Sequence, residues 1–203
     1  MPLATKVRDD VVQKAKYSDV PRFEILARND RRVLVFEDSP RRRTIFYHPY
    51  LSDKNTVYQI GIPWAYYMLV RTRGDHALVR ACLFFSEVRL EDEGHKALGL
   101  APLPNIFNRK AYEPQGTICL GRERHDNLSP RALIERFWGY RFTGEIAREQ
   151  DTAPMSIEAY GWGTLRRWAA LTRKGIELKG FQPITSSGKM LSVSELVDIV
   201  SKD

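Results

Sequence analysis

Hydrophobic residues follow two different patterns along this chain of 203 residues. From residue 23 to residue 85, short runs rich in β-branched and aromatic side chains alternate with turn residues such as Asn29-Asp30 and Asp38-Ser39-Pro40. Runs of this kind, bounded by Gly, Pro, Asn and Asp, predict β-strands. The predicted strands are 23–27, 32–36, 44–47, 57–60, 66–71 and 76–85, with a hairpin tip at Arg73-Gly74-Asp75. Their order predicts an antiparallel meander of four to six strands.

After the strand-like runs, helical spacing returns beyond Asn127. Ser129-Pro130 predicts a helix start, because serine caps free backbone amides and proline is tolerated in the first turn. A second helix is predicted over about 156–173, and a third follows Ser192, where Ser192-Val193-Ser194-Glu195 fits a capping box. A short helix is also predicted over 7–16. Strands followed by helices predict an α+β fold.

The stretch between these halves, from Arg89 to Asn127, has no periodicity and is rich in proline and glycine. A loop of this length inside a compact domain is usually functional or disordered. Candidate functional residues are therefore expected in this stretch.

Composition and charge limit the function classes. The formal charge of +7 favours acidic partners such as an acidic protein surface. The basic residues are scattered, however, and no groove-reading helix or aromatic RNA platform is recognisable, so nucleic-acid binding ranks last. The densest basic cluster, Pro40-Arg41-Arg42-Arg43, is interpreted as a solvated turn. No apolar run is long enough to span a bilayer and no signal-peptide pattern is present, which predicts a cytoplasmic protein without a membrane partner.

The chain has two cysteines, Cys82 and Cys119. Two are too few for a disulfide scaffold, and neither forms a zinc-like spacing with histidine, so no metal site is predicted. Cys82 lies in an apolar strand-like run and is interpreted as an inert core residue. Cys119 lies in the Gly/Pro-rich stretch, where a thiol is easier to reach.

Two short motifs in that stretch suggest thiol chemistry. Leu103-Pro104-Asn105-Ile106 supplies a side-chain amide, and Gly116-Thr117-Ile118-Cys119-Leu120 supplies a thiol. A thiol that carries an acyl group needs a donor for the charge that develops on the carbonyl oxygen, and asparagine provides one without competing as a nucleophile. Cys119 is thus the candidate nucleophile and Asn105 the candidate oxyanion donor, while Pro104 and Gly116 are predicted to shape the loop.

Each of these assignments has a plainer alternative. Cys119 could be a small buried hydrophobe, and Asn105 a turn residue that bonds its own backbone. His125-Asp126, six residues after the thiol, is interpreted as a polar loop ahead of the Ser129 cap. A Cys/His pair of a thiol hydrolase is the alternative for that histidine.

The motifs resemble the core of ubiquitin-conjugating enzymes, where His-Pro-Asn precedes Gly-x-Ile-Cys-Leu and a Trp-Ser-Pro helix start follows. The corresponding segments are Leu103-Pro104-Asn105, Gly116 to Leu120 and Leu128-Ser129-Pro130. Leu-Pro-Asn, together with Phe137-Trp138 and Phe142-Thr143, is similar to a bacterial branch of that superfamily. Members of this branch are often encoded in mobile or plasmid-borne cassettes beside a ThiF-like activating enzyme.

The resemblance implies that Cys119 receives a ubiquitin-like modifier as a thioester from a ThiF-like enzyme and passes it to an amine. Asn105 would stabilise the oxyanion, and no cofactor would be needed. It also implies an N-terminal extension (1–20), a ubiquitin-conjugating-enzyme-like core (21–150) and a C-terminal helical extension (151–203).

Three departures from the family pattern favour an alternative, a non-catalytic relative that serves as a binding or structural component of a phage or plasmid system. Leu103 replaces the motif histidine, residues 144–203 match no family feature, and the spacing from Asn105 to Cys119 is several residues longer than usual. The longer spacing could place Asn105 away from the thiol.

Overall fold

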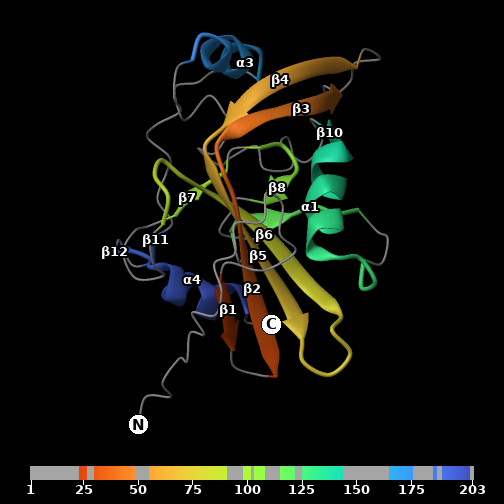
Figure 1. Ribbon diagram of the computed structural model, residues 1–203, viewed down its shortest axis with the longest axis vertical. Coiled ribbons are helices and arrows are strands. Elements are labelled where there is room, and N and C mark those ends of the chain that lie inside the picture. Colours follow the sequence, from red (N-terminus) through yellow and green to blue (C-terminus); the bar gives the residue numbers. More distant parts are fainter. Residues whose placement is uncertain are drawn as a thin grey trace.

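The computed structural model describes residues 23–26, 30–48, 55–90, 98–101, 103–107, 115–121, 125–143, 165–175, 185–186 and 189–201. Within these ranges the chain forms three helices and mainly antiparallel sheets (Figure 1), which confirms the predicted α+β class. The helix predicted over 7–16 and the first part of the helix predicted over 156–173 lie outside the described residues.

The strands are β1 (Phe23–Leu26), β2 (Arg31–Asp38), β3 (Arg41–His48), β4 (Thr56–Ile62), β5 (Trp64–Thr72), β6 (Leu78–Ser86), β7 (Gly99–Leu100), β8 (Ile106–Phe107), β9 (Thr117–Ile118), β10 (Arg141–Thr143), β11 (Thr185–Ser186) and β12 (Lys189–Met190). The helices are α1 (Pro130–Gly139), α3 (Leu165–Arg173) and α4 (Val193–Val200). All six strands predicted in the first half of the chain are present as β1 to β6.

Strands β2 to β5 form one long, bent hairpin. β2 pairs with β5 and β3 pairs with β4 in a single continuous register, with Asp38 opposite Ala65 and Arg41 opposite Ile62. Continuing this register places Pro40 opposite Pro63, where the two sets of pairs meet. Proline has no N–H to donate to a neighbouring strand, so the hydrogen-bond ladder is interrupted on both strands and the hairpin bends there (Figure 1).

If β2 and β3 are treated as one bent strand, and β4 and β5 as another, the chain forms the predicted antiparallel meander. Its four antiparallel strands are β1, β2 with β3, β4 with β5, and β6. Below the bend the sheet has the order β1-β2-β5-β6-β9-β8, and β7 also pairs with β6. Above the bend, β10 pairs in parallel with β3 to give a small sheet of order β10-β3-β4.

Helices cover both faces of the large sheet (Figure 1). On one face, α1 and α3 pack against inward residues of the hairpin and β6; this first core includes Leu34, Ile45, Ile60, Tyr67, Leu83, Phe137 and Trp168. On the other face lies α4; this second core includes Val35, Met68, Cys82, Phe84, Leu196 and Val200. Central strands β5 and β6 are therefore buried on both sides, which explains their continuous apolar runs. Both α3 and α4, from the segment expected as a C-terminal extension, contribute to these cores.

Both predicted helix caps are confirmed. At α1, the Ala132 N–H donates to Ser129 Oγ at 3.2 Å, and Pro130 occupies the first turn. At α4, the Glu195 N–H donates to Ser192 Oγ at 3.3 Å, while the Ser192 N–H donates to Glu195 Oε2 at 2.8 Å. These bonds satisfy backbone donors that a helix start otherwise leaves unpaired.

Candidate active site

The stretch without periodicity is joined to the large sheet by three very short strands. β7 pairs with β6 at Phe84 and Phe85, β9 pairs with β6 at Cys82, and β8 pairs with β9. Each of these strands is two residues long. Two residues are too few to produce an alternating pattern, so the sequence carried no signal for them.

Pairing of β8 with β9 brings the two candidate catalytic residues together. Ile106 lies opposite Ile118, which makes Asn105 and Cys119 the next pair along the ladder. The Cys119 N–H donates to the Asn105 carbonyl at 2.9 Å. The alternative in which the longer spacing places Asn105 away from Cys119 is therefore wrong for the backbone, because the additional residues fall between two paired strands. We call this paired segment, 105–107 with 117–119, the thiol hairpin.

The Cys119 thiol is free and its residue is half-buried. Cys82, in contrast, is fully buried in the second core. Burial raises the pKa of the Cys82 thiol to about 12, against a weaker opposing effect of the Thr117 hydroxyl, which lies 3.8 Å from the sulfur. A thiol that is inaccessible and resists ionisation is a poor nucleophile, so the interpretation of Cys82 as an inert core residue is confirmed.

The side chain of Asn105 is bound to β10. Its Nδ2 donates to the Arg141 carbonyl at 3.2 Å, and its Oδ1 accepts from the Thr143 N–H at 3.1 Å. The carboxamide thus donates to a backbone carbonyl and accepts from a backbone N–H of β10, as the main chain of a paired strand would. These two bonds hold the thiol hairpin against β10. Asn105 does lie in the turn before β8 and is only 5% exposed, but its side chain bonds a distant strand and not its own backbone as the alternative expected. Its amide nitrogen carries two hydrogens, and the Arg141 carbonyl takes one of them.

Gly116 shapes the start of the thiol hairpin in two ways. Its φ of +86° lies in the region that favours glycine. A Cβ at this position would meet Phe84 Cε1 at 2.3 Å, far inside van der Waals contact. The Gly116 carbonyl also accepts from the Leu83 N–H of β6 at 2.9 Å, which anchors this end of the segment to the sheet. Pro104, the other residue expected to shape the loop, is buried in the turn before β8.

His125 braces the chain just after the thiol. Its Nε2 lies 2.9 Å from the carbonyl of Leu120, the residue that follows Cys119, and donates a hydrogen bond to it. Asp126 Oδ1 accepts from the Leu78 N–H at 3.1 Å. No hydrogen bond joins the described side chains of His125 and Cys119. These contacts agree with a structural loop ahead of the Ser129 cap and give no support to a Cys/His pair.

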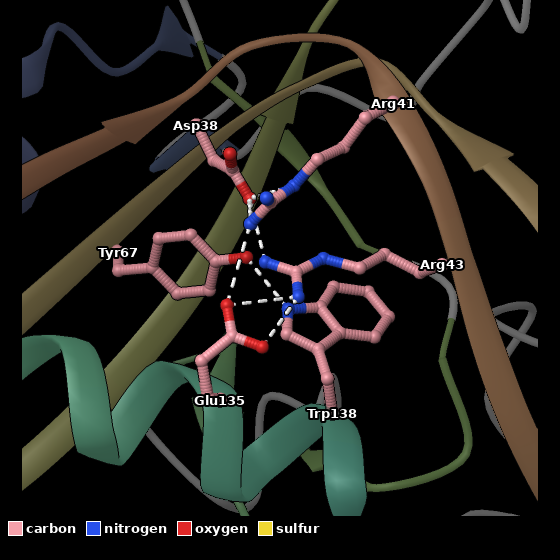
Figure 2. A network of polar contacts seen from close by, with 6 residues as sticks. All are labelled: Asp38, Arg41, Arg43, Tyr67, Glu135 and Trp138. Atoms are coloured by element: carbon pink, nitrogen blue, oxygen red, sulfur yellow. Dashed lines mark hydrogen bonds and ion pairs between the residues drawn. The ribbon is translucent and has the colours of Figure 1, made fainter. Parts of the chain in front are cut away.

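A second polar cluster lies between the hairpin bend and α1 (Figure 2). The interpretation of Pro40-Arg41-Arg42-Arg43 as a solvated turn is wrong: the chain bends at Pro40, and Arg41 already belongs to β3. The side chain of Arg43 is only 9% exposed. Its Nη2 donates to Asp38 Oδ2 at 2.8 Å and its Nη1 to Glu135 Oε2 at 2.9 Å. The period-two alternation of β3 was the missed signal, because Ile45 points inward and Arg43 must point the same way.

Aromatic residues complete this cluster. The Arg43 guanidinium carbon lies 5.2 Å from the ring centroid of Trp138, whose Nε1 donates to Tyr67 Oη at 2.8 Å. Arg41 Nε donates to Asp38 at 2.9 Å. The cluster thus fastens the bend of the hairpin, from both sides of Pro40, to helix α1.

Asp38 makes this fastening dependent on pH. Burial raises the pKa of the Asp38 carboxyl to about 6; the Arg43 charge opposes the rise and the Glu135 charge adds to it. Since the folded pKa exceeds its ordinary value of 3.8, the stabilisation due to proton binding is complete below about pH 4 and is lost as the pH rises through 6.

We therefore expect the free energy of unfolding of the wild type, minus that of Asp38→Asn, to fall as the pH rises from about 4 to about 7. The expected fall is about 1–2 kcal/mol, after a discount for the partial exposure of the carboxyl. Urea denaturation of both proteins at intervals of half a pH unit measures this difference. A difference that stays constant or rises over the same range would contradict the prediction.

Comparisons of the chain with models of protein families, with curated proteins and with solved structures each found no match. The resemblance to ubiquitin-conjugating enzymes therefore rests on the sequence motifs alone. Among the helices that the structure describes, none is long and apolar enough to cross a membrane. Nor do three or more His, Cys, Asp or Glu side chains within the described ranges gather where they could hold a metal ion.

Proposed function

We propose that this protein is a ubiquitin-conjugating-enzyme-like carrier that holds a ubiquitin-like modifier as a thioester on Cys119. The observation that carries the proposal is the register of the thiol hairpin, which pairs Cys119 with Asn105, together with the partial exposure of the Cys119 residue. Two residues from separate short motifs thus become neighbours, as a shared role in one reaction requires.

The proposed reaction has two acyl transfers. In the first, the Cys119 thiolate attacks the thioester carbonyl of the modifier on a ThiF-like activating enzyme, and the thiolate of that enzyme leaves. In the second, an amine attacks the Cys119 thioester, the Cys119 thiolate leaves, and the amine proton passes to solvent. Thioester exchange needs no strongly acidic thiol, because nucleophilicity falls as thiol pKa falls. No histidine of the described residues is bonded to Cys119, which is compatible with this chemistry.

Asn105 has two proposed roles, one structural and one in the reaction. Its contacts with β10 hold the thiol hairpin in place. Its second amide hydrogen is the donor available for the charge that develops on the carbonyl oxygen in each transfer. The protein would act in the cytoplasm without a cofactor of its own, and its activating enzyme and modifier would be encoded beside it in a mobile or plasmid-borne cassette.

The test is thioester formation with the neighbouring activating enzyme, ATP and the cognate modifier. We expect an adduct that thiol reductants release and that falls at least 100-fold in Cys119→Ala. Cys119→Ser should form an oxygen ester that resists the same reductants. Cys82→Ala is the matched control and should retain the adduct, because Cys82 is buried in the second core. An adduct that persists in Cys119→Ala would refute the assignment of the nucleophile.

The second candidate function is a non-catalytic relative that acts as a binding or structural component of a phage or plasmid system. One observation favours it: both ends of the Asn105 carboxamide are already engaged in structural bonds with β10. Labelling of the native protein with a maleimide separates the two candidates. A carrier should react at Cys119 within minutes in the absence of denaturant, whereas labelling that requires denaturant would favour the non-catalytic candidate.

A further inference from the structure

The small sheet of β10, β3 and β4 has an outer face that α3 covers only near Gly61 of β4, whose added Cβ would meet Thr172. In β3, Arg43 and Ile45 point inward, whereas Thr44 and Phe46 are exposed. Phe46 lies opposite Val57 of β4 and next to Arg141 of β10. Phe46 is 48% exposed and Val57 57%, more than any other large hydrophobic residue in the described part of the chain. This exposed apolar pair lies near the loop end of the β3–β4 hairpin, and such a pair indicates an interaction site when it does not stand alone.

Cations lie on the same face as this pair. Arg42 lies on the same side of β3 as Phe46, and its Nη2 donates to the Arg173 carbonyl at 3.4 Å. This bond places the end of α3 at one corner of the face. At the opposite corner is Arg141, which is exposed beside Phe46. Lys174 follows Arg173 and is also exposed.

The described elements that form this surface contribute no carboxylate. The sequences of β3, β4, β10 and α3 contain no Asp or Glu. The inward arginines of β3, Arg41 and Arg43, are neutralised by Asp38 and Glu135. Among the described residues, the outward cations Arg42, Arg141, Arg173 and Lys174 make no ion pair. Within the described ranges, the outer face therefore carries positive charge without a counter-charge, on the same side as the apolar pair.

We propose that this outer face is a docking surface for an acidic polypeptide segment that carries an apolar side chain. The apolar side chain would pack on Phe46 and Val57, and the carboxylates would pair with the outward arginines and Lys174. We name this surface the Phe46 face. Docking at the Phe46 face does not depend on the chemistry of Cys119, since a carrier and a non-catalytic relative could both use it.

A single-stranded nucleic acid fits the Phe46 face less well. Sheets that bind such strands use several exposed aromatic rings as stacking platforms. Phe46 is the only Phe, Tyr or Trp at the outward positions of the described β3, β4 and β10. Tyr47 and Tyr58 are half-buried and pack against the first core instead. The cross-strand partner of Phe46 is the aliphatic Val57, which suits an apolar side chain and offers no surface for a base to stack on.

The experiment selects binders from a displayed library of random 12-residue peptides against the full chain. Fluorescence anisotropy then measures the dissociation constants of the selected peptides and of a 12-nucleotide oligo-dT strand. We expect selected peptides to carry net negative charge and at least one large apolar residue. The double variant Phe46→Ser/Val57→Ser should weaken their binding at least tenfold, and Arg141→Glu should weaken it and reduce its dependence on salt.

Matched controls use comparable residues elsewhere on the molecule. Val79 and Val88 are also exposed hydrophobics, so Val79→Ser/Val88→Ser should change the dissociation constant less than twofold. Arg73, at the hairpin tip, is 45% exposed and serves as the control charge reversal, Arg73→Glu. Thermal melting checks that each variant folds. Selected peptides without acidic residues, or binding that the Phe46 variant does not weaken, would overturn the proposal. So would oligo-dT binding that depends on Phe46 and exceeds peptide binding, which would assign the face to nucleic acid.

Discussion

Replacing Arg43 by methionine is expected to lower the free energy of unfolding by about 3 kcal/mol. The substitution removes the guanidinium that joins Asp38 to Glu135 and covers the ring of Trp138. Methionine fills much of the same space but leaves Asp38, whose side chain is 17% exposed, with Arg41 as its remaining cation. Losing one partner of a buried ion pair is costly because the other charge stays without compensation.

Three comparisons test this explanation. Arg42→Met alters the neighbouring but exposed arginine and should change stability by less than about 1 kcal/mol. In Asp38→Asn/Arg43→Met, the uncompensated carboxylate is also removed, so the double variant should lose less stability than the sum of the two single variants. Because the Arg43 charge lowers the pKa of Asp38, that pKa should rise above 6 in Arg43→Met.

Urea denaturation followed by tryptophan fluorescence measures these stabilities, and Trp138 reports directly on the cluster. A loss below about 1 kcal/mol in Arg43→Met would show that the cluster contributes little net stability, as some buried ion pairs do. In that case its role would be to set the angle of the hairpin bend.

Gly116→Ala is expected to destabilise the protein by more than about 3 kcal/mol. A φ of +86° is strained for alanine. In addition, the new Cβ would stand 2.3 Å from a ring carbon of Phe84, which is completely buried in the second core and cannot move aside without repacking. The Gly116 carbonyl also ties the thiol hairpin to β6 through the Leu83 N–H. The substitution should therefore displace the thiol hairpin as well as destabilise the protein.

Two other glycines distinguish the effect of backbone strain from the effect of the steric contact with Phe84. Gly121 has a φ of +75°, but the nearest atom to its Cβ position is Tyr140 Oη at 3.9 Å, so Gly121→Ala should lose only about 1–2 kcal/mol from backbone strain. Gly139 has open space, so Gly139→Ala should be close to neutral. Phe84→Leu combined with Gly116→Ala should recover part of the loss by making room. Chemical denaturation of all four variants provides the measurements, and equal losses in Gly116→Ala and Gly121→Ala would show that the steric contact is unimportant.

The thiol hairpin illustrates how far sequence alone can reach. Its two motifs were recognisable, and so were the need for glycine at position 116 and the difference between Cys82 and Cys119. The pairing of Asn105 with Cys119 was not, because it is made by strands of two residues separated by a segment of unpredictable path. The bonds from the Asn105 amide to β10 were equally hidden, since their partners lie 36 and 38 residues further along the chain.

Sequence by itself determined the features that depend on near neighbours: the six strand segments, the caps at Ser129 and Ser192, and hence the α+β class. These follow from alternation, turn residues and capping bonds that span only a few positions. Tertiary structure alone decided the features that depend on distant partners. These features are the bend of the hairpin where Pro40 lies opposite Pro63 and the burial of Arg43 between Asp38 and Glu135. The exposure of Phe46 is a third. Burial of a charge becomes favourable only when folding supplies its counter-charge, and that information lies in the packing of elements far apart in sequence.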